Sequence, residues 1–284
     1  MWIAKTIDEL RRRRAALEGT VVLVPTMGAL HSGHLAHLAA GREVGDHVLV
    51  SIFLNPAQFC AGEDLSRYPQ PIEQDFSKCE LAGVDGVFYP SAKEMYPPGQ
   101  VDIQVTAPAM AQLLEGQCRP GHFEGVCQVV LKLLNIVHPD VATFGCKDYQ
   151  QMRIIEIMVD DLNVQTRIER IATVRDDDGL AMSSRNTYLL APQRRRAMGL
   201  YKALCEARRL VEDAGETDPG AIETVMLDLL AAHRVNTDYA VVRHPRTLAP
   251  VDSANPSLTS GIVALVAGRV DKIRLIDNMV LGAG

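Results

Sequence analysis

A β-branched apolar run, Val21-Val22-Leu23-Val24, leads directly into a glycine-bearing turn, and this junction constrains the fold more than any other feature. The run is typical of a strand that is buried on both faces. The turn occupies residues 25–34, and the apolar spacing of residues 35–40 predicts a helix after it. A strand, a turn and a helix in this order present backbone N–H groups and the positive end of a helix to an anion. The junction therefore predicts a phosphate-binding turn.

Two histidines in this turn carry groups suited to phosphate chemistry. His31 and His34 lie on one face if the helix begins there, and Gly28 and Gly33 allow the main chain to approach a phosphate closely. An imidazole can donate to a phosphate oxygen, and its protonated form can offset charge that develops during phosphoryl transfer. Two alternatives stay open on these residues alone. The pair could be half of a metal site, although no nearby carboxylate or third histidine completes a ligand set. The segment could also be a tight turn with incidental histidines.

Composition excludes several classes of protein. The 284 residues are 47% hydrophobic, so a large core and two domains are expected. The net charge of −6 gives no indication of a nucleic-acid partner. The start of the chain lacks a signal-peptide pattern, no apolar run has membrane-spanning length, and none of the six cysteines forms a Cys-x-x-Cys pair. These features predict a cytoplasmic protein with reduced thiols and no membrane partner.

Strands and helices are predicted to alternate through the first part of the chain. Predicted strands cover residues 21–24, 47–53, 84–90, 141–144 and 164–172, with an edge strand over 101–105. Predicted helices cover residues 7–17, 35–41, 72–82, 109–114, 126–137 and 149–159, with loops over 61–71 and 115–121. The first helix begins with a capping box formed by Thr6 and Glu9. This alternation predicts a doubly wound parallel α/β domain over residues 1–173.

The pattern changes at Val174. Long amphipathic helices are predicted over residues 192–211 and 218–233, and strands over 238–242, 261–266 and 273–276. A smaller α+β domain over residues 174–284 is therefore expected.

Two further turns carry groups that suit phosphate. The run Gly145-Cys146-Lys147-Asp148 follows a predicted strand and opens a helix, so it predicts a second anion site with a lysine charge. The run Met182-Ser183-Ser184-Arg185 offers two hydroxyls and a guanidinium that can bind phosphate oxygens bidentately. Each turn alone is a weak signal. Together the three turns predict a nucleoside triphosphate held between a helix N-terminus and a loop of the second domain.

Two amide side chains follow the predicted strand over residues 47–53. Ligands of an open parallel sheet lie beyond the carboxyl ends of its strands. Asn55 and Gln58 therefore emerge at the same edge as His31 and His34 if the two strands are neighbours.

The motifs of one family occur in order along nearly the whole chain. They are Pro25-Thr26-Met27-Gly28, His31-x-Gly33-His34, Ser51-Ile52-Phe53, Asn55-Pro56-x-Gln58-Phe59, Arg119-Pro120-Gly121-His122-Phe123, Phe144-Gly145-x-Lys147-Asp148 with Gln151, Gly179 to Asn186, and Arg274-Leu275-Ile276-Asp277-Asn278. By these motifs the chain resembles the pantothenate synthetase (pantoate–β-alanine ligase) family, of the HIGH-type nucleotidyltransferase-like superfamily. The resemblance implies a Rossmann-like ATP- and pantoate-binding domain with a smaller C-terminal lid domain, and a homodimer.

The resemblance also implies a two-step condensation. Pantoate attacks the α-phosphate of ATP and releases pyrophosphate, and β-alanine then attacks the acyl carbon of pantoyl adenylate and releases AMP. A carboxylate is a poor acylating agent, and adenylation gives it a good leaving group. Such chemistry needs positioning and charge neutralisation more than a protein nucleophile.

Matching positions carry the roles of the family's residues. The catalytic residues implied are His31, His34, Lys147, Ser183, Ser184 and Arg185, with His34 as the proton donor. The residues implied to line ATP are Met27, Gly28, Ala29, Leu30, His31, Ser32, Gly33, His34, Gly145, Cys146, Lys147, Asp148, Val174, Met182, Ser183, Ser184 and Arg185. Those implied to bind pantoate or β-alanine are the neutral amides Asn55, Gln58 and Gln151. Tyr68 matches the gate of the active site, Mg²⁺ would bridge phosphate oxygens, and Asp75 is the candidate metal ligand.

The chain departs from the family's pattern at three positions. Cys146 replaces a usual glutamate, Gln74 replaces one member of a common acidic pair, and Ser32 replaces a usual acidic residue between the histidines. Two rival functions are a nucleotidyltransferase that stops at the adenylylated product and a nucleotide-binding regulator without chemistry. The paired amides Gln58 and Gln151 argue against the first rival. The intact set His31, His34, Lys147 and Arg185 argues against the second.

Overall fold

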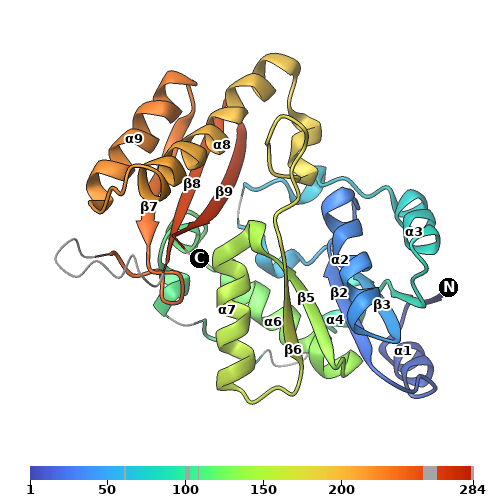
Figure 1. Cartoon of the computed structure of the whole chain (residues 1–284). Coiled ribbons are helices and arrows are strands. Elements are labelled where there is room, and N and C mark those ends of the chain that lie inside the picture. The colour runs from blue at the N-terminus through green and yellow to red at the C-terminus, as the bar shows by residue number, and fades with distance from the viewer. Residues whose placement is uncertain (61, 100–102, 108, 252–260, 283–284) are drawn as a thin grey trace. The chain divides into compact units, whose positions relative to one another are not determined.

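The computed structural model describes residues 1–60, 62–99, 103–107, 109–251 and 261–282 (Figure 1). The chain divides into two compact units. The first contains residues 1–146 and 151–172, and the second contains residues 147–150 and 173–284. The four residues 147–150, which follow a strand of the first unit in sequence, thus belong with the second unit.

The first unit is built on a six-stranded sheet in which all neighbouring strands are parallel. Its strands are β1 (Trp2–Ala4), β2 (Val21–Thr26), β3 (His47–Ile52), β4 (Gly86–Phe88), β5 (Val141–Gly145) and β6 (Arg167–Ile171), in the order β1-β4-β3-β2-β5-β6. The chain moves from β2 to β3 in one direction and later returns to β5 on the other side of β2. Ligands of such sheets bind where the strand order reverses, which here is the carboxyl end of β2.

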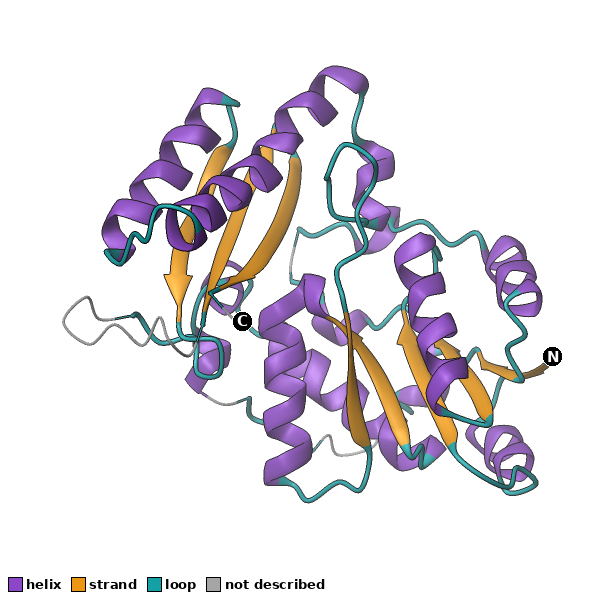
Figure 2. Ribbon diagram, viewed as in Figure 1, coloured by secondary structure: helices purple, strands orange, loops and turns teal. Residues whose placement is uncertain are grey.

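Helices connect these strands, as the alternation in the sequence predicted (Figure 2). They are α1 (Ile7–Arg14), α2 (Ser32–Val44), α3 (Ile72–Leu81), α4 (Ala92–Met95), α5 (Glu115–Cys118), α6 (His122–Val137) and α7 (Tyr149–Asp161). Single turns of 3₁₀ helix occupy η1 (Pro56–Gln58), η2 (Leu65–Arg67), η3 (Ala109–Gln112) and η4 (Cys146–Asp148). The capping box of α1 is confirmed, since Glu9 N donates to Thr6 and Thr6 N donates to Glu9. The predicted parallel α/β class is also confirmed.

The local predictions need correction at several places. The strand β1 was missed because three residues at a sheet edge are too short for a periodic signal, although they pair with β4. The segment 115–121 is a loop only after α5, and η3 ends at residue 112 rather than 114. Residues 103–105 are not in a strand, and residues 101–102 of the predicted edge strand lie outside the described residues.

Apolar residues of the strands form the core that holds the turn after β2. Val22 and Val24 pack in one cluster with Leu30 of the turn and Leu38 of α2. Leu30 is 3% exposed, so its burial fixes the turn against the sheet.

The second unit has an antiparallel sheet beneath two long helices. Its strands are β7 (Asn236–Arg243), β8 (Ile262–Val270) and β9 (Ile273–Leu281), in the order β7-β8-β9. The helices α8 (Ala191–Glu212) and α9 (Pro219–Ala232) pack against each other, with α8 on β8 and β9 and α9 on β7. A further 3₁₀ segment, η5, covers Ser184–Tyr188. The predicted smaller α+β part is confirmed.

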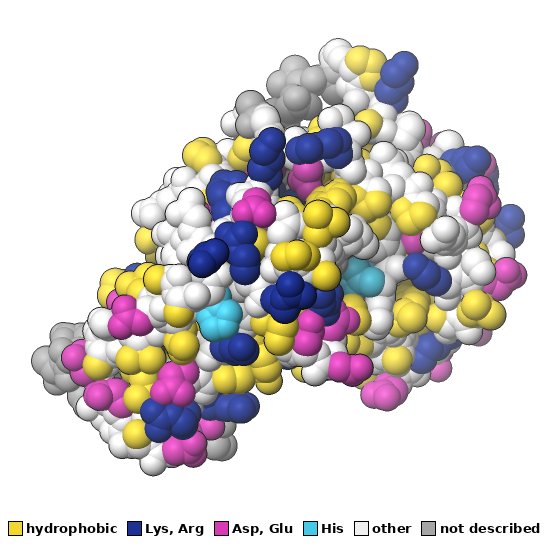
Figure 3. All heavy atoms as spheres, turned by 90° about the horizontal axis from the view of Figure 1, so that it is seen from above, with side chains coloured by type: hydrophobic (Ala, Val, Ile, Leu, Met, Phe, Trp, Pro, Cys, Tyr) yellow, Lys and Arg dark blue, Asp and Glu magenta, His cyan; other side chains and the backbone are white. Residues whose placement is uncertain are grey.

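The surface carries both signs of charge. On the face shown in Figure 3, Lys and Arg side chains stand close to Asp and Glu side chains, with apolar side chains between them. Among the described residues, no helix combines the length and the apolar character needed to cross a membrane.

Candidate active site

The turn that follows β2 is held from outside by a carboxylate of α3. Asp75 accepts hydrogen bonds from two consecutive backbone amides, with Ala29 N and Leu30 N each 2.8 Å from one of its oxygens. Lys78, one turn later on α3, donates from Nζ to Leu30 O at 2.6 Å. Gly28 has φ +84° and Ala29 has φ +53°, so the backbone enters the left-handed region at both positions. The carboxylate bonds offset the strain of Ala29 in a region that non-glycine residues rarely adopt.

The two histidines together cap the N-terminus of α2. His31 is the N-cap residue, and its Nδ1 accepts from Gly33 N at 3.2 Å. His34 Nδ1 accepts in turn from His31 N at 3.2 Å, and the two ring centroids lie 4.1 Å apart. An imidazole nitrogen that accepts an N–H bond carries no proton, so each neutral ring has its proton on Nε2. The sequence located both histidines correctly at the helix start, but it did not reveal this reciprocal cap.

Neighbouring strands bring the amide side chains to the same turn. Because β2 and β3 pair in parallel, with Thr26 opposite Ile52, the residues after both strands emerge at one edge. Gln58 Nε2 donates to Met27 Sδ at 3.2 Å, and Gln58 Oε1 accepts from Asn55 Nδ2 at 3.0 Å. Gln58 thus lies against Met27, the first residue after β2.

Asn55 has a supporting place in this arrangement. Asn55 is 1% exposed. Its Nδ2 also donates to Gly125 O at 3.1 Å, and its Oδ1 accepts from Tyr96 Oη at 2.9 Å and from Ala57 N at 3.3 Å. The side chain of Asn55 is therefore occupied in orienting Gln58 and the turn η1.

Two expected parts of the site lie in the first unit, namely the gate residue Tyr68 and the start of the second turn at Gly145 and Cys146. Tyr68 is 7% exposed, and its ring stands edge-on to Phe59 at 6.2 Å. Gly145 ends β5, and a Cβ at this position would lie 3.2 Å from His37 Nε2. Cys146 follows it, and burial is the main reason why the pKa of its thiol is raised.

The remaining predicted phosphate ligands belong to the second unit. Lys147 Nζ lies 3.1 Å from the carboxylate of its neighbour Asp148. The main-chain oxygen of Lys147 accepts from Asn278 Nδ2 at 2.7 Å. Asn278 follows Asp277, which is 3% exposed and pairs with Arg175 through bonds of 2.6 and 3.0 Å. The motif at the end of the chain thus fixes the backbone at Lys147.

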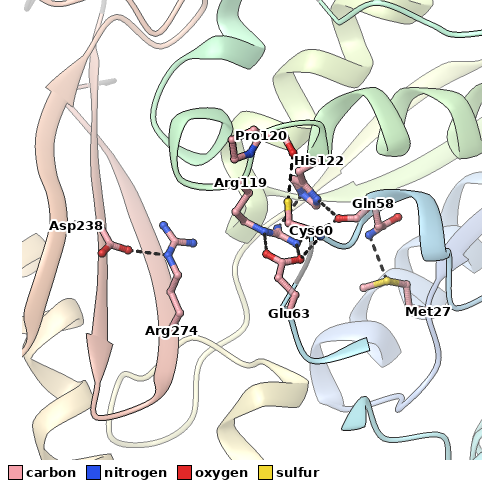
Figure 4. Close-up of polar contacts among 9 residues, drawn as sticks. All are labelled: Met27, Gln58, Cys60, Glu63, Arg119, Pro120, His122, Asp238 and Arg274. Carbon is pink, nitrogen blue, oxygen red and sulfur yellow. Dashed lines mark hydrogen bonds and ion pairs between the residues drawn. The ribbon is translucent and has the colours of Figure 1, made fainter. Parts of the chain in front are cut away.

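The serine-rich turn of the second unit is also organised by backbone bonds. Met182 N donates to Val174 O at 2.9 Å, which brings together two residues expected to line ATP. Ser183 caps η5, because its Oγ accepts from Arg185 N at 3.3 Å. In the same unit, Arg274 Nε donates to Asp238 Oδ2 at 2.6 Å and ties β9 to β7 (Figure 4).

The described residues do not offer a ready protein site for a metal ion. They contain no group of three or more His, Cys, Asp or Glu side chains that could hold one. Asp75, the expected ligand, directs both oxygens to the amides of the turn. The structure therefore gives Asp75 a role in holding the turn. The donor set does not fit a metal held by protein side chains, and any Mg²⁺ would depend on the phosphates for its ligands.

Fold and site together define a class of protein. A parallel sheet with a reversal of strand order at β2, and a glycine turn that opens a helix at that point, is the architecture of doubly wound α/β proteins that bind anionic ligands there. Within this class, residues 2–280 match the profile of the family described as pantoate-beta-alanine ligase. The chain therefore belongs to the pantoate–β-alanine ligase family, and the predicted ligase class is confirmed.

Individual relatives agree over almost the full length. The chain is 45% identical to pantothenate synthetase from Acidothermus cellulolyticus over 277 residues, which cover 98% of this chain and 90% of that protein. The solved pantothenate synthetase from Thermus thermophilus is 41% identical, with a TM-score of 0.91 and coverage of 98% and 99%. A pantoate-beta-alanine ligase from Francisella tularensis, 31% identical with a TM-score of 0.82, covers 100% of this chain and 99% of its own. That protein was crystallised with βγ-ATP and β-alanine.

Proposed function

We propose that this chain joins pantoate to β-alanine in two steps that consume ATP. In the first step a carboxylate oxygen of pantoate attacks the α-phosphorus of ATP, and the bond to pyrophosphate breaks. In the second step the amine of β-alanine attacks the acyl carbon of pantoyl adenylate, AMP leaves with the bonding electrons, and the amine loses a proton. The observation that carries the proposal is the contact of the Gln58 amide with the histidine-capped turn, since it puts a neutral substrate-binding group beside an anion-binding one.

The turn of the first unit would bind the triphosphate. Residues 27–34 supply the start of α2, where backbone amides and the helix dipole favour negative charge. In their neutral form His31 and His34 each carry the ring proton on Nε2, so each ring can donate a hydrogen bond to a phosphate oxygen. We assign to His34 the donor that stabilises charge as pyrophosphate departs, with His31 supporting it.

Residues of the second unit would add positive charge and hydroxyl donors. Lys147 and Arg185 neutralise the leaving pyrophosphate, and Ser183 and Ser184 donate to its oxygens. The further residues proposed to line ATP are Gly145, Cys146, Asp148, Val174 and Met182. The backbone anchors of Lys147 and Met182 support this assignment, because a preorganised group costs less reorganisation during reaction.

Pantoate would lie against the amides Gln58 and Gln151, which bind its hydroxyls and carboxylate without competing as nucleophiles. Asn55 supports Gln58 through the bond at 3.0 Å, and Tyr68 is proposed as the gate residue. Mg²⁺ would accompany ATP through phosphate oxygens, and no step is assigned to it. A homodimer and a cytoplasmic location are further proposals, and light scattering of the purified chain tests the first.

One assay tests the proposed function against its rivals. ATP, pantoate and β-alanine are supplied together, and AMP, pyrophosphate and pantothenate are measured. Equal amounts of AMP and pantothenate are expected. Pyrophosphate without an amide product would favour a nucleotidyltransferase. Retained ATP binding without turnover would favour a regulator.

A further inference from the structure

The motif Arg119-Pro120-Gly121-His122 has no role in the chemistry proposed above, yet the side chains of Arg119 and His122 both approach the main-chain oxygen of Gln58 (Figure 4). The motif joins α5 to α6, and His122 is the first residue of α6. His122 is 6% exposed, and its Nδ1 lies 2.7 Å from the main-chain oxygen of Gln58. A buried ring in this position holds a residue that is proposed to bind substrate.

The neighbouring guanidinium decides where the proton of His122 lies. Arg119 Nη1 is 2.9 Å from His122 Nε2. Because a guanidinium can only donate, His122 Nε2 is the acceptor, and the ring proton of neutral His122 is on Nδ1. The bond to Gln58 therefore runs from His122 Nδ1–H to the carbonyl oxygen. Burial first, and then the charge of Arg119, lower the pKa of His122 to about 4, so the neutral tautomer prevails at pH 7.

A carboxylate in turn holds Arg119. Glu63 accepts from Arg119 Nε at 2.5 Å and from Arg119 Nη2 at 2.8 Å, a bidentate pair. Burial works to raise the pKa of Glu63, but the bonds and charge of Arg119 outweigh it and the pKa is lowered. Arg119 Nη2 also lies 3.5 Å from the carbonyl of Gln58. Three side chains thus form one chain of contacts that ends at Gln58.

Close packing leaves the backbone at Gln58 little freedom. A Cβ at Gly125 of α6 would lie 2.2 Å from Ala57 O and 2.7 Å from Gln58 N, so only glycine permits this approach. The carbonyl of Gln58 is fixed by His122 from one side, and its amide side chain is fixed by Asn55 and Met27 from the other. The His122 bond therefore holds the backbone of Gln58, from which the amide side chain reaches Met27.

We infer that His122 is a positioning residue for pantoate binding, which it serves by holding the Gln58 carbonyl, with Arg119 and Glu63 selecting its Nδ1–H tautomer. The inference rests on the proposed function, in which Gln58 binds pantoate. A group that acts only on Gln58 affects the KM for pantoate and leaves the KM for ATP unchanged. A group that only stabilises the fold lowers the melting temperature and affects both substrates alike.

The variants His122→Asn and His122→Gln separate these roles. The asparagine Nδ2 stands close to the position of imidazole Nδ1 and can donate to Gln58 O. The glutamine amide reaches the position of Nε2 and cannot. His122→Gln removes the shorter of the two hydrogen bonds to the Gln58 carbonyl and leaves only the 3.5 Å contact from Arg119, so it is expected to raise the KM for pantoate roughly 10-fold or more. His122→Asn is expected to stay within about threefold of the unaltered chain, since it keeps one neutral hydrogen bond.

The measurements are the KM values for pantoate and for ATP, kcat, and the melting temperature with and without pantoate. Equal pantoate KM values in the two variants, or a parallel rise of both KM values, would overturn the inference. If either variant does not fold, Glu63→Gln provides the same test, because it weakens the hold on Arg119 and should raise the pantoate KM alone. Lack of turnover by the unaltered chain would overturn the proposed function and this inference together, whereas turnover with unchanged pantoate KM in all variants would overturn the inference alone.

Discussion

Replacement of Asp75 by asparagine removes the charge that holds the turn after β2 and preserves the shape of the side chain. Each carboxylate oxygen accepts one bond, from Ala29 N and from Leu30 N, at 2.8 Å. Asparagine can accept only one of these bonds, because its Nδ2 carries hydrogens that would face the other N–H. One amide of the turn is then left opposite a donor. The turn must relax away from its left-handed conformation at Ala29 or remain strained there.

The expected magnitude follows from these contacts. A hydrogen bond to a charged group contributes about 1.5–3 kcal/mol, and a buried donor without an acceptor costs about 1–3 kcal/mol. Asp75 is 1% exposed, so water does not replace the lost acceptor. We expect a total loss of about 3 kcal/mol, divided between the free energy of unfolding and the binding of ATP. If the whole loss appears as reduced stability, Tm falls by about 6–12 °C. If the whole loss appears as weaker ATP binding, the KM for ATP rises roughly 100-fold.

Thermal melting and steady-state kinetics measure the two parts of this loss. Glu73→Gln is the matched control, because Glu73 lies exposed on the same helix and loses the same charge. The control should change stability by less than about 0.5 kcal/mol. Kinetics at increasing Mg²⁺ separate the two roles of Asp75. If high Mg²⁺ restores the activity of Asp75→Asn, Asp75 acts as a metal ligand and the reasoning is refuted. Unchanged Tm and ATP KM in the variant would refute it as well.

Four further outcomes are expected. His34→Ala should lower the rate of adenylation roughly 100-fold, measured as pyrophosphate release, because it removes a charge-stabilising donor; a change below about threefold would contradict its role. Burial and a neighbouring guanidinium hold the pKa of His122 at about 4, below its ordinary 6.5, so the unfolded chain binds a proton there that the folded chain does not. The neutral ring therefore contributes its full share to the free energy of unfolding above pH 6.5, and this contribution falls by on the order of 3 kcal/mol as the pH drops to 4. Urea denaturation across this pH range should show a smaller decrease in the free energy of unfolding for His122→Asn. Arg175→Met leaves the buried carboxylate of Asp277 unpaired and should lower the free energy of unfolding, measured by urea denaturation, by about 3–5 kcal/mol. A loss of only about 1 kcal/mol would show that this pair contributes no more than an exposed ion pair. Cys146→Glu should leave the KM for ATP equal or lower, and a large loss of activity would show that the position is rebuilt around the thiol.

Local pattern was sufficient for most of the secondary structure. The runs at β2 and β3 are apolar nearly throughout, which a strand covered on both faces requires, and the same property predicted a parallel sheet. The capping box at Thr6 and Glu9 depends on residues three apart, so sequence alone contains it. The strand β1 could not be predicted, because its three residues gain their order from pairing with β4 more than eighty positions later.

The candidate site divides in the same way. Motif spacing identified the turn, its two histidines and the amides after β3. The family resemblance, rather than the spacing, made Asp75 the candidate metal ligand, and in the structure both of its oxygens accept hydrogen bonds from the turn. Motif spacing gave no role to His122 or Glu63, since their contacts join segments that are distant along the chain. Which nitrogen of each histidine holds the proton also depends on partners that only folding supplies.

The sequence by itself determined most of the strands and helices, the parallel sheet, the position of the anion-binding turn and the family. These properties depend on residues within one or two turns of each other, or on motifs that are preserved as letters. The tertiary structure decided that a carboxylate of α3 holds the turn, that two imidazoles cap α2 for each other, and that Arg119 selects the tautomer of His122. Hydrogen bonds of this kind require two groups within about 3 Å of each other. Only the packed chain brings Asp75 within that distance of the turn, whose amides lie 46 and 45 positions earlier. The partners in the two histidine contacts are three residues apart, so the sequence already sets them near each other and the packed chain sets the orientation of their side chains.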